Sequence, residues 1–153
     1  MKKLINNVIS LTVIFSLLAM LTSCKKQRSA EDILREFCLA YPIEGEIFVS
    51  LSDKDGAYTD RDSITALFGD GFEPPHEYAL IINSKINTVT EIAVFIIQSS
   101  AQRGHLSEFA SERITFLESF LDSEGFMIRR GDVFVYGFIE DKERAVRIFE
   151  GIL

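Results

Sequence analysis

The chain has 153 residues, with 16 Lys and Arg against 23 Asp and Glu, so its net charge at pH 7 is −7. An acidic chain without a clustered basic surface lacks the electrostatic footprint of nucleic-acid binding, and we expect no nucleic-acid partner. The length suits one folded domain and excludes two of ordinary size.

The N-terminus has the pattern of a secretory leader. Lys2 and Lys3 give a positive start, and the apolar run Val8–Leu21 follows with 14 residues. A bilayer span needs about 20 apolar residues, so this run is of signal-peptide length. The alternative is an uncleaved anchor helix over Leu4–Ser23, which could span if stretched.

The run ends in Leu21-Thr22-Ser23-Cys24. This segment resembles a bacterial lipobox, in which an apolar residue and two small residues precede the cysteine that receives diacylglycerol. The resemblance implies cleavage between Ser23 and Cys24, removal of residues 1–23 as a signal peptide, and lipid on Cys24. We therefore expect the protein at the cell membrane, lipid-anchored on the extracytoplasmic face.

Residues 24–28 then form a lipidated basic tether. Two acyl chains suffice for stable anchoring, and Lys25, Lys26 and Arg28 each add about 1 kcal/mol against anionic lipid. The leader holds two lysines and no acid, so the mature net charge is −9. Cys38 is then the remaining cysteine, without a disulfide partner, and we expect it to be a buried small hydrophobic residue.

Hydrophobic periodicity predicts one α+β domain over residues 29–153, in the order α-β-α-β-β-α-β-β-α. The expected elements are a helix capped by Ser29 and ended by Pro42, the strand Glu46–Leu51, a polar loop Ser52–Tyr58, a short helix opened by Thr59, the strands Tyr78–Asn83 and Ile92–Ile97, the long helix Arg103–Ser123, the hairpin strands Phe126–Arg130 and Val133–Ile139, and a last helix capped by Asp141. Short connections indicate an antiparallel or mixed sheet of about five strands with helices packed on it. Ile92–Ile97 has no polar residue and should lie centrally with both faces covered.

Several segments resemble a family of uncharacterised small lipoproteins from low-GC Gram-positive bacteria, a domain of unknown function. They are Ile64-Thr65-Ala66-Leu67-Phe68-Gly69, Glu91-Ile92-Ala93-Val94-Phe95, and Gly131-Asp132 with the following Val133-Phe134-Val135 and Asp141. These motifs are structural and not chemical. The resemblance therefore implies a lipoprotein of this fold and brings no activity with it.

The densest acidic segment surrounds Gly56. Aligned on a calcium-binding EF-hand loop, Asp53, Asp55 and Asp62 fall on ligand positions, but Leu51 falls on the first position and cannot coordinate. A strand, not a helix, is expected before it. We therefore expect a solvated turn with helix caps and no bound metal or cofactor, and these three aspartates are the candidates if a metal does bind.

The two histidines lack convincing partners in the sequence. His76 lies between Glu73 and Glu77, but Pro74-Pro75 excludes the helix on which metalloprotease ligands are spaced. We expect this segment to be a solvated loop and His105 to be exposed on the long helix. Arg130-Gly131-Asp132 spells an adhesion tripeptide, yet a hairpin tip explains it better.

We therefore predict a non-catalytic binding or accessory module of the cell envelope, with an unidentified protein or envelope component as its partner. The alternative is an envelope enzyme or a metal-binding lipoprotein of calcium or hydrolase type. Such a protein would have to use the Asp53–Asp62 loop together with His76.

Overall fold

The computed structural model describes residues 28–50, 57–58, 64, 68–69, 72–85 and 88–153. Its elements are α2 (Ala30–Ala40), β1 (Glu46–Val49), β2 (Ala57–Tyr58), β3 (Glu77–Lys85), β4 (Thr88–Ile96), α4 (Ser100–Glu118), β5 (Glu124–Arg130), β6 (Val133–Ile139) and α5 (Lys142–Ile152). The predicted α+β class and the order of strands and helices are confirmed. Of the short helix expected after Thr59, Ile64 and Phe68 are described and are helical, and the rest lies outside the described residues.

The strands form one sheet in the order β2-β1-β3-β4-β6-β5. All neighbours from β1 to β5 are antiparallel, and β2 alone is parallel to its neighbour β1. The loop expected over 52–58 thus ends in two strand residues, Ala57 and Tyr58, which pair with β1. Through this pairing, backbone groups on the outer edge of β1 find hydrogen-bond partners within the protein.

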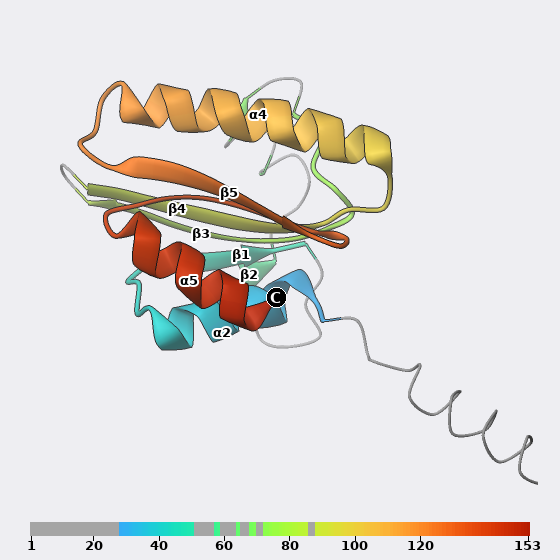
Figure 1. Ribbon diagram of the computed structural model, residues 1–153, viewed down its shortest axis with the longest axis horizontal. Helices are drawn as coiled ribbons and strands as arrows, with labels where there is room; N and C mark the ends of the chain where they lie inside the picture. The colour runs from blue at the N-terminus through green and yellow to red at the C-terminus, as the bar shows by residue number, and fades with distance from the viewer. Residues whose placement is uncertain (1–27, 51–56, 59–63, 65–67, 70–71, 86–87) are drawn as a thin grey trace, which may run out of the picture.

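Helices cover both faces of the sheet, α4 on one and α2 with α5 on the other (Figure 1). The strand predicted to be central, Ile92–Ile97, lies between β3 and β6 and is buried throughout. Successive side chains of a strand point to opposite faces. Ile92 and Val94 therefore belong to the core beneath α2 and α5, whereas Ala93 and Phe95 belong to the core beneath α4.

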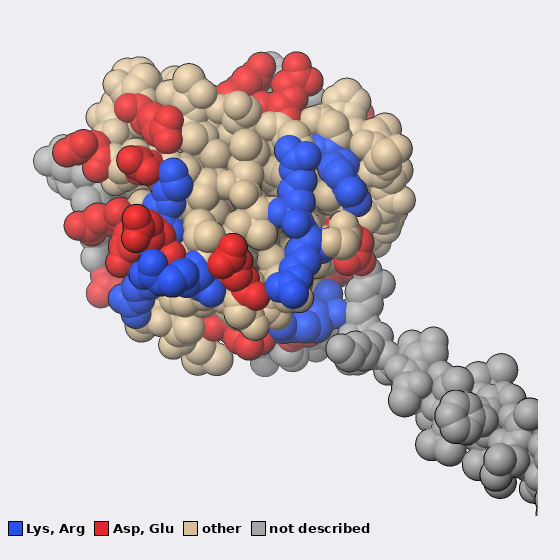
Figure 2. Space-filling model, viewed as in Figure 1, with Lys and Arg blue, Asp and Glu red and all other residues tan. Residues whose placement is uncertain are grey.

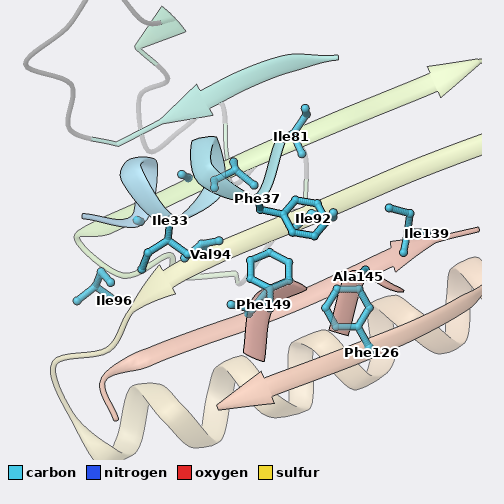
Figure 3. Close-up of a cluster of buried hydrophobic side chains, with 14 of the residues drawn as sticks. Ile33, Phe37, Ile81, Ile92, Val94, Ile96, Phe126, Ile139, Ala145 and Phe149 are labelled. Carbon is cyan, nitrogen blue, oxygen red and sulfur yellow. The ribbon is translucent and has the colours of Figure 1, made fainter. Parts of the chain in front are cut away.

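Aromatic rings join the α2–α5 layer to the sheet (Figure 3). Phe37 of α2 stacks on Phe149 of α5 with ring centroids 4.2 Å apart, and Phe126 of β5 lies 6.0 Å from Phe149. Gly137 makes room for this packing, because a Cβ there would lie 2.5 Å from the Phe126 ring. Such pairs contribute about 0.5–1.5 kcal/mol beyond the area that they bury.

The caps predicted at Ser29 and Asp141 are confirmed, the one predicted at Thr59 lies outside the described residues, and some element ends differ from expectation. Ser29 Oγ accepts a hydrogen bond from Asp32 N at 3.0 Å, and Asp141 Oδ1 accepts one from Arg144 N at 3.0 Å. The long helix begins at Ser100 and ends at Glu118, where the prediction had 103–123. It ends early because the chain must turn back before β5, whose second residue donates its N–H to Glu118. The β3–β4 ladder also runs on to Lys85 and Thr88, through a segment that was expected to be a connection.

Candidate functional site

The described domain begins at Arg28, which is held between the two helices of one layer. Its Nη1 donates to the Ile152 carbonyl at 2.7 Å, and its guanidinium pairs with the Glu36 carboxylate. Four residues of extended chain reach about 13–14 Å, so Cys24 lies within that distance of the α2–α5 layer. Ser23 and Cys24 themselves lie outside the described residues, and their cleavage and lipidation stay predictions.

The candidate metal ligands Asp53, Asp55 and Asp62 also lie outside the described part of the chain. Within that part, no three His, Cys, Asp or Glu side chains come together in a way that could hold a metal ion. None of the described helices is long and apolar enough to span a membrane.

The segment around His76 is only partly the solvated loop that was expected. His76 and Glu73 are exposed, but Pro74 and Pro75 are buried. Glu77 Oε1 accepts a hydrogen bond from Ala30 N at 2.9 Å, at the first residue of α2. A carboxylate at a helix N-terminus satisfies a free N–H and offsets the helix dipole. Glu77 therefore anchors α2 to the sheet.

Two further residues singled out in the sequence, His105 and Cys38, lie in the described chain. His105 is exposed on α4, as expected. Cys38 is half-buried and not fully buried, because it lies on the flank of α2 beside the inward stripe that contains Leu34 and Phe37. Burial still raises the pKa of its thiol.

The Arg130-Gly131-Asp132 tripeptide forms the tip of the β5–β6 hairpin. Gly131 adopts φ 63°, in the left-handed region that a tight hairpin turn requires. The turn carbonyls are used within the fold, since Ile97 N donates to Asp132 O at 2.7 Å and Arg103 Nη2 donates to Gly131 O at 3.0 Å. The predicted structural account of this tripeptide therefore fits its contacts.

A buried charged network between α4 and the sheet escaped the sequence analysis as a site. Glu91 of β4 is fully buried and receives two hydrogen bonds from Arg113 of α4. The Tyr136 hydroxyl, from the adjacent strand β6, also donates to Glu91 Oε1. Burial, and next the Glu91 charge, raise the pKa of Tyr136 well above its usual value, and the hydrogen bond to Glu91 raises the pKa of Arg113.

The polar groups of Glu91, Arg113 and Tyr136 are hydrogen-bonded to one another. In the described chain, every buried side-chain nitrogen or oxygen has a hydrogen-bond partner. The signal in the sequence was a carboxylate directly before an all-apolar strand, together with an arginine within the apolar stripe of the long helix. Because a buried charge needs a partner, those two residues could have been expected to meet.

Two surface features remain. An open groove of about 520 Å³ follows β5, lined among others by Ser111, Thr115 and Glu118 of α4, Met127 of β5, and Lys142 and Val146 of α5. At the C-terminal end of α4, Phe116 in the helix and Phe120 in the turn after it are 55 % and 72 % exposed, with ring centroids 5.1 Å apart. We call these two residues the α4 aromatic pair. They lie on the layer opposite the one that holds Arg28.

No family model matches the chain, and no curated protein or solved structure matches it significantly. The resemblance to small uncharacterised lipoproteins therefore stays a prediction.

Proposed function

We propose that this chain is a lipid-anchored protein of the extracytoplasmic face of the cell membrane, and that its domain acts there by contact with a protein or another envelope component. The observation that carries the proposal is the place of Arg28. It lies four residues after the lipobox-like Cys24 and is already bound to α2 and α5. A domain that starts so near its lipid stays within reach of the headgroups.

The contacts of Arg28 favour one orientation. They support an orientation in which the α2–α5 layer faces the bilayer and Leu39 of α2, 85 % exposed, meets the lipid interface. Lys25 and Lys26 are attracted by anionic lipid, whereas the acidic body is repelled by it. The α4 layer then faces away from the membrane.

The α4 layer, which faces outward, carries the exposed surface that contacts the partner in this proposal. The α4 aromatic pair exposes two large rings at the end of a helix whose inward face buries Leu106 and Leu117. Exposed aromatic residues in contact are typical of protein interaction sites, because a partner can bury much apolar area at low entropic cost. The Arg113 guanidinium lies 6.0 Å from the centroid of the Phe116 ring, and this contact helps to hold the ring in place.

The anchor is tested by metabolic labelling with a fatty-acid analogue. Cys24→Ser should abolish labelling and processing, with Cys38→Ser as the matched control that keeps both. Label that survives on Cys24→Ser would contradict the lipid anchor.

The contact function is tested by photo-crosslinking from position 116 or 120 in the lipidated protein, followed by mass spectrometry. We expect one recurrent partner, and we expect Phe116→Ser with Phe120→Ser to remove the cellular effect of the protein. Glu112→Ser, at another exposed position of α4 to which no contact role is assigned, is the control. The enzyme or metal alternative predicts the reverse: Asp53→Ala, Asp55→Ala and His76→Ala together would act like a deletion, and the aromatic variant would be silent.

A further inference from the structure

β5 forms one edge of the sheet. In the described structure it pairs with β6 and with no other strand. The hairpin closes through two residues, and Arg130 lies opposite Val133. In such a hairpin the closing pair is hydrogen-bonded and every second pair after it is too. The backbone groups of Arg130, Ile128, Phe126 and Glu124 therefore face β6.

The backbone groups of the intervening residues, Gly125, Met127 and Arg129, face outward. One contact supports this alternation: Gly125 N donates to the Glu118 side chain at 2.9 Å, so this N–H points away from β6 and would exchange Glu118 for a strand partner. Met127 N–H and C=O lie at the middle of the edge, and the Met127 side chain is 41 % exposed beside the groove. A row of outward N–H and C=O groups is a template for another strand.

The sequence of this edge is complementary to itself in the antiparallel sense. When two copies are paired about Met127, Met127 lies opposite Met127, Gly125 opposite Arg129, and Glu124 opposite Arg130. Each opposed pair then joins outward groups to outward groups or inward groups to inward groups, so the ladder is in register. Both charged ends meet their opposites, since exposed Glu124 faces exposed Arg130 of the second copy. Each would exchange a surface contact within its own chain for this pair, Glu124 that with Lys142 and Arg130 that with the Glu150 carbonyl.

We propose that two copies of this chain pair along β5, antiparallel about Met127, into one continuous sheet with twofold symmetry. Figure 2 shows the charge pattern of this face. An uncharged strip runs between α4 and α5, with most of the Asp and Glu on the left, where some Lys and Arg lie among them, and a band of Lys and Arg on the right. A twofold rotation brings each charged end against the opposite charge of the other copy.

The expected distance between the two α4 helices fits this pairing. Paired strands lie about 4.8 Å apart, and α4 packs over β5 and β6. The two α4 helices would therefore be about 8–10 Å apart, a usual distance for packed helices. The α4 residues that line the groove include Ser111 and Thr115, which are small enough for that approach.

The same symmetry is compatible with two anchors in one bilayer. The twofold axis of an antiparallel strand pair is perpendicular to the sheet, so both α2–α5 layers lie on the same side. In each copy Arg28, at the start of the described chain, lies on that side. The pairing itself does not rest on the proposed lipid anchor, because unlipidated chains would form the same ladder.

Disulfide formation in the full chain, purified in detergent and also kept in its membranes, tests the proposal. Residues opposite each other in a hydrogen-bonded antiparallel pair have Cα atoms about 5.5 Å apart, within the range that a disulfide bridges. Met127→Cys in a Cys38→Ala background should give a covalent dimer on mild oxidation. Phe116→Cys, also at an exposed position but away from the axis, is the matched control and should stay mostly monomeric.

Charge exchange tests the register. Glu124→Arg alone and Arg130→Glu alone should each lower the Met127→Cys dimer yield, with dimerisation weakened about tenfold. The two single variants mixed together, or both changes in one chain, should restore it. Because the double variant returns the dimer, a loss in the singles cannot be attributed to misfolding.

Three results would overturn the proposal: equal crosslinking at positions 116 and 127, no rescue by the double variant, or crosslinks from position 127 to a different protein only. Each of these leaves the lipid anchor untouched. Conversely, a failure of fatty-acid labelling at Cys24 leaves the edge pairing untouched.

Discussion

Arg113 and Glu91 form a two-point ion pair that joins α4 to the sheet, with Nε 3.0 Å from Oε1 and Nη2 2.7 Å from Oε2. The Glu91 side chain is fully buried, and that of Arg113 is 23 % exposed. A buried carboxylate tolerates few alternative positions, because each one leaves its charge without a partner. The pair therefore specifies how α4 lies on the sheet.

Removing the arginine should be costly. Arg113→Met leaves Glu91 buried and without its charged partner, and we expect the free energy of unfolding to fall by about 3–5 kcal/mol. Urea unfolding followed by circular dichroism measures this. Glu91→Leu and Arg113→Met combined with Tyr136→Phe remove both charges and the hydroxyl that donates to Glu91, and should recover much of the loss. A triple variant as unstable as the single would contradict this account of the pair.

Tyr136 should make the domain sensitive to alkali. Its pKa is raised in the folded state, chiefly by burial, above the value of about 10 that an unfolded chain has. The resulting stability is fully present below pH 10 and is lost as the pH rises from there toward the folded pKa. Spectroscopic titration should show that Tyr136 ionises only as the domain unfolds, a component absent in Tyr136→Phe. Ionisation of Tyr136 near pH 10 in folded protein would refute this.

One substitution at two glycines should have opposite effects. A Cβ at Gly125 would lie 2.3 Å from Ile114 Cγ2, so Gly125→Ala should destabilise by about 1–3 kcal/mol. A Cβ at Gly104, exposed in α4, would meet nothing within 4 Å, so Gly104→Ala should stabilise by about 0.5–1 kcal/mol. Thermal unfolding of the two variants beside the parent checks both signs. A neutral Gly125→Ala would mean that α4 packs less closely on β5 than described.

Cys38 should react slowly with a thiol reagent at neutral pH. Burial raises its pKa and so lowers the thiolate fraction, although Arg35 opposes this shift. We expect the rate to increase in denaturant by more than it would for an exposed thiol. Cys24→Ser in the background leaves Cys38 as the thiol observed. Equal rates in native and denatured protein would show that the half-buried position gives no protection.

Local patterns predicted the elements well. Ser29 and Asp141 were identified as helix caps, and the Gly131-Asp132 turn as a hairpin tip, because caps and tight turns depend on a few neighbouring residues. The all-apolar Ile92–Ile97 was identified as central because only a strand covered on both faces can be apolar throughout. Element ends were less accurate, since the last turn of a helix and the first pairs of a ladder depend on what lies across from them.

The candidate sites depended on contacts between distant segments. Glu77 was weighed with His76 as a chemical group, and its partner proved to be the α2 N-terminus, 47 residues away. Glu91 meets Arg113 from 22 residues away and Tyr136 from 45. Periodicity identifies an apolar face, but it does not say which face of a sheet a helix covers or which buried charges meet there. Those choices arise when the layers pack, because only then does desolvation require each buried charge to have a partner.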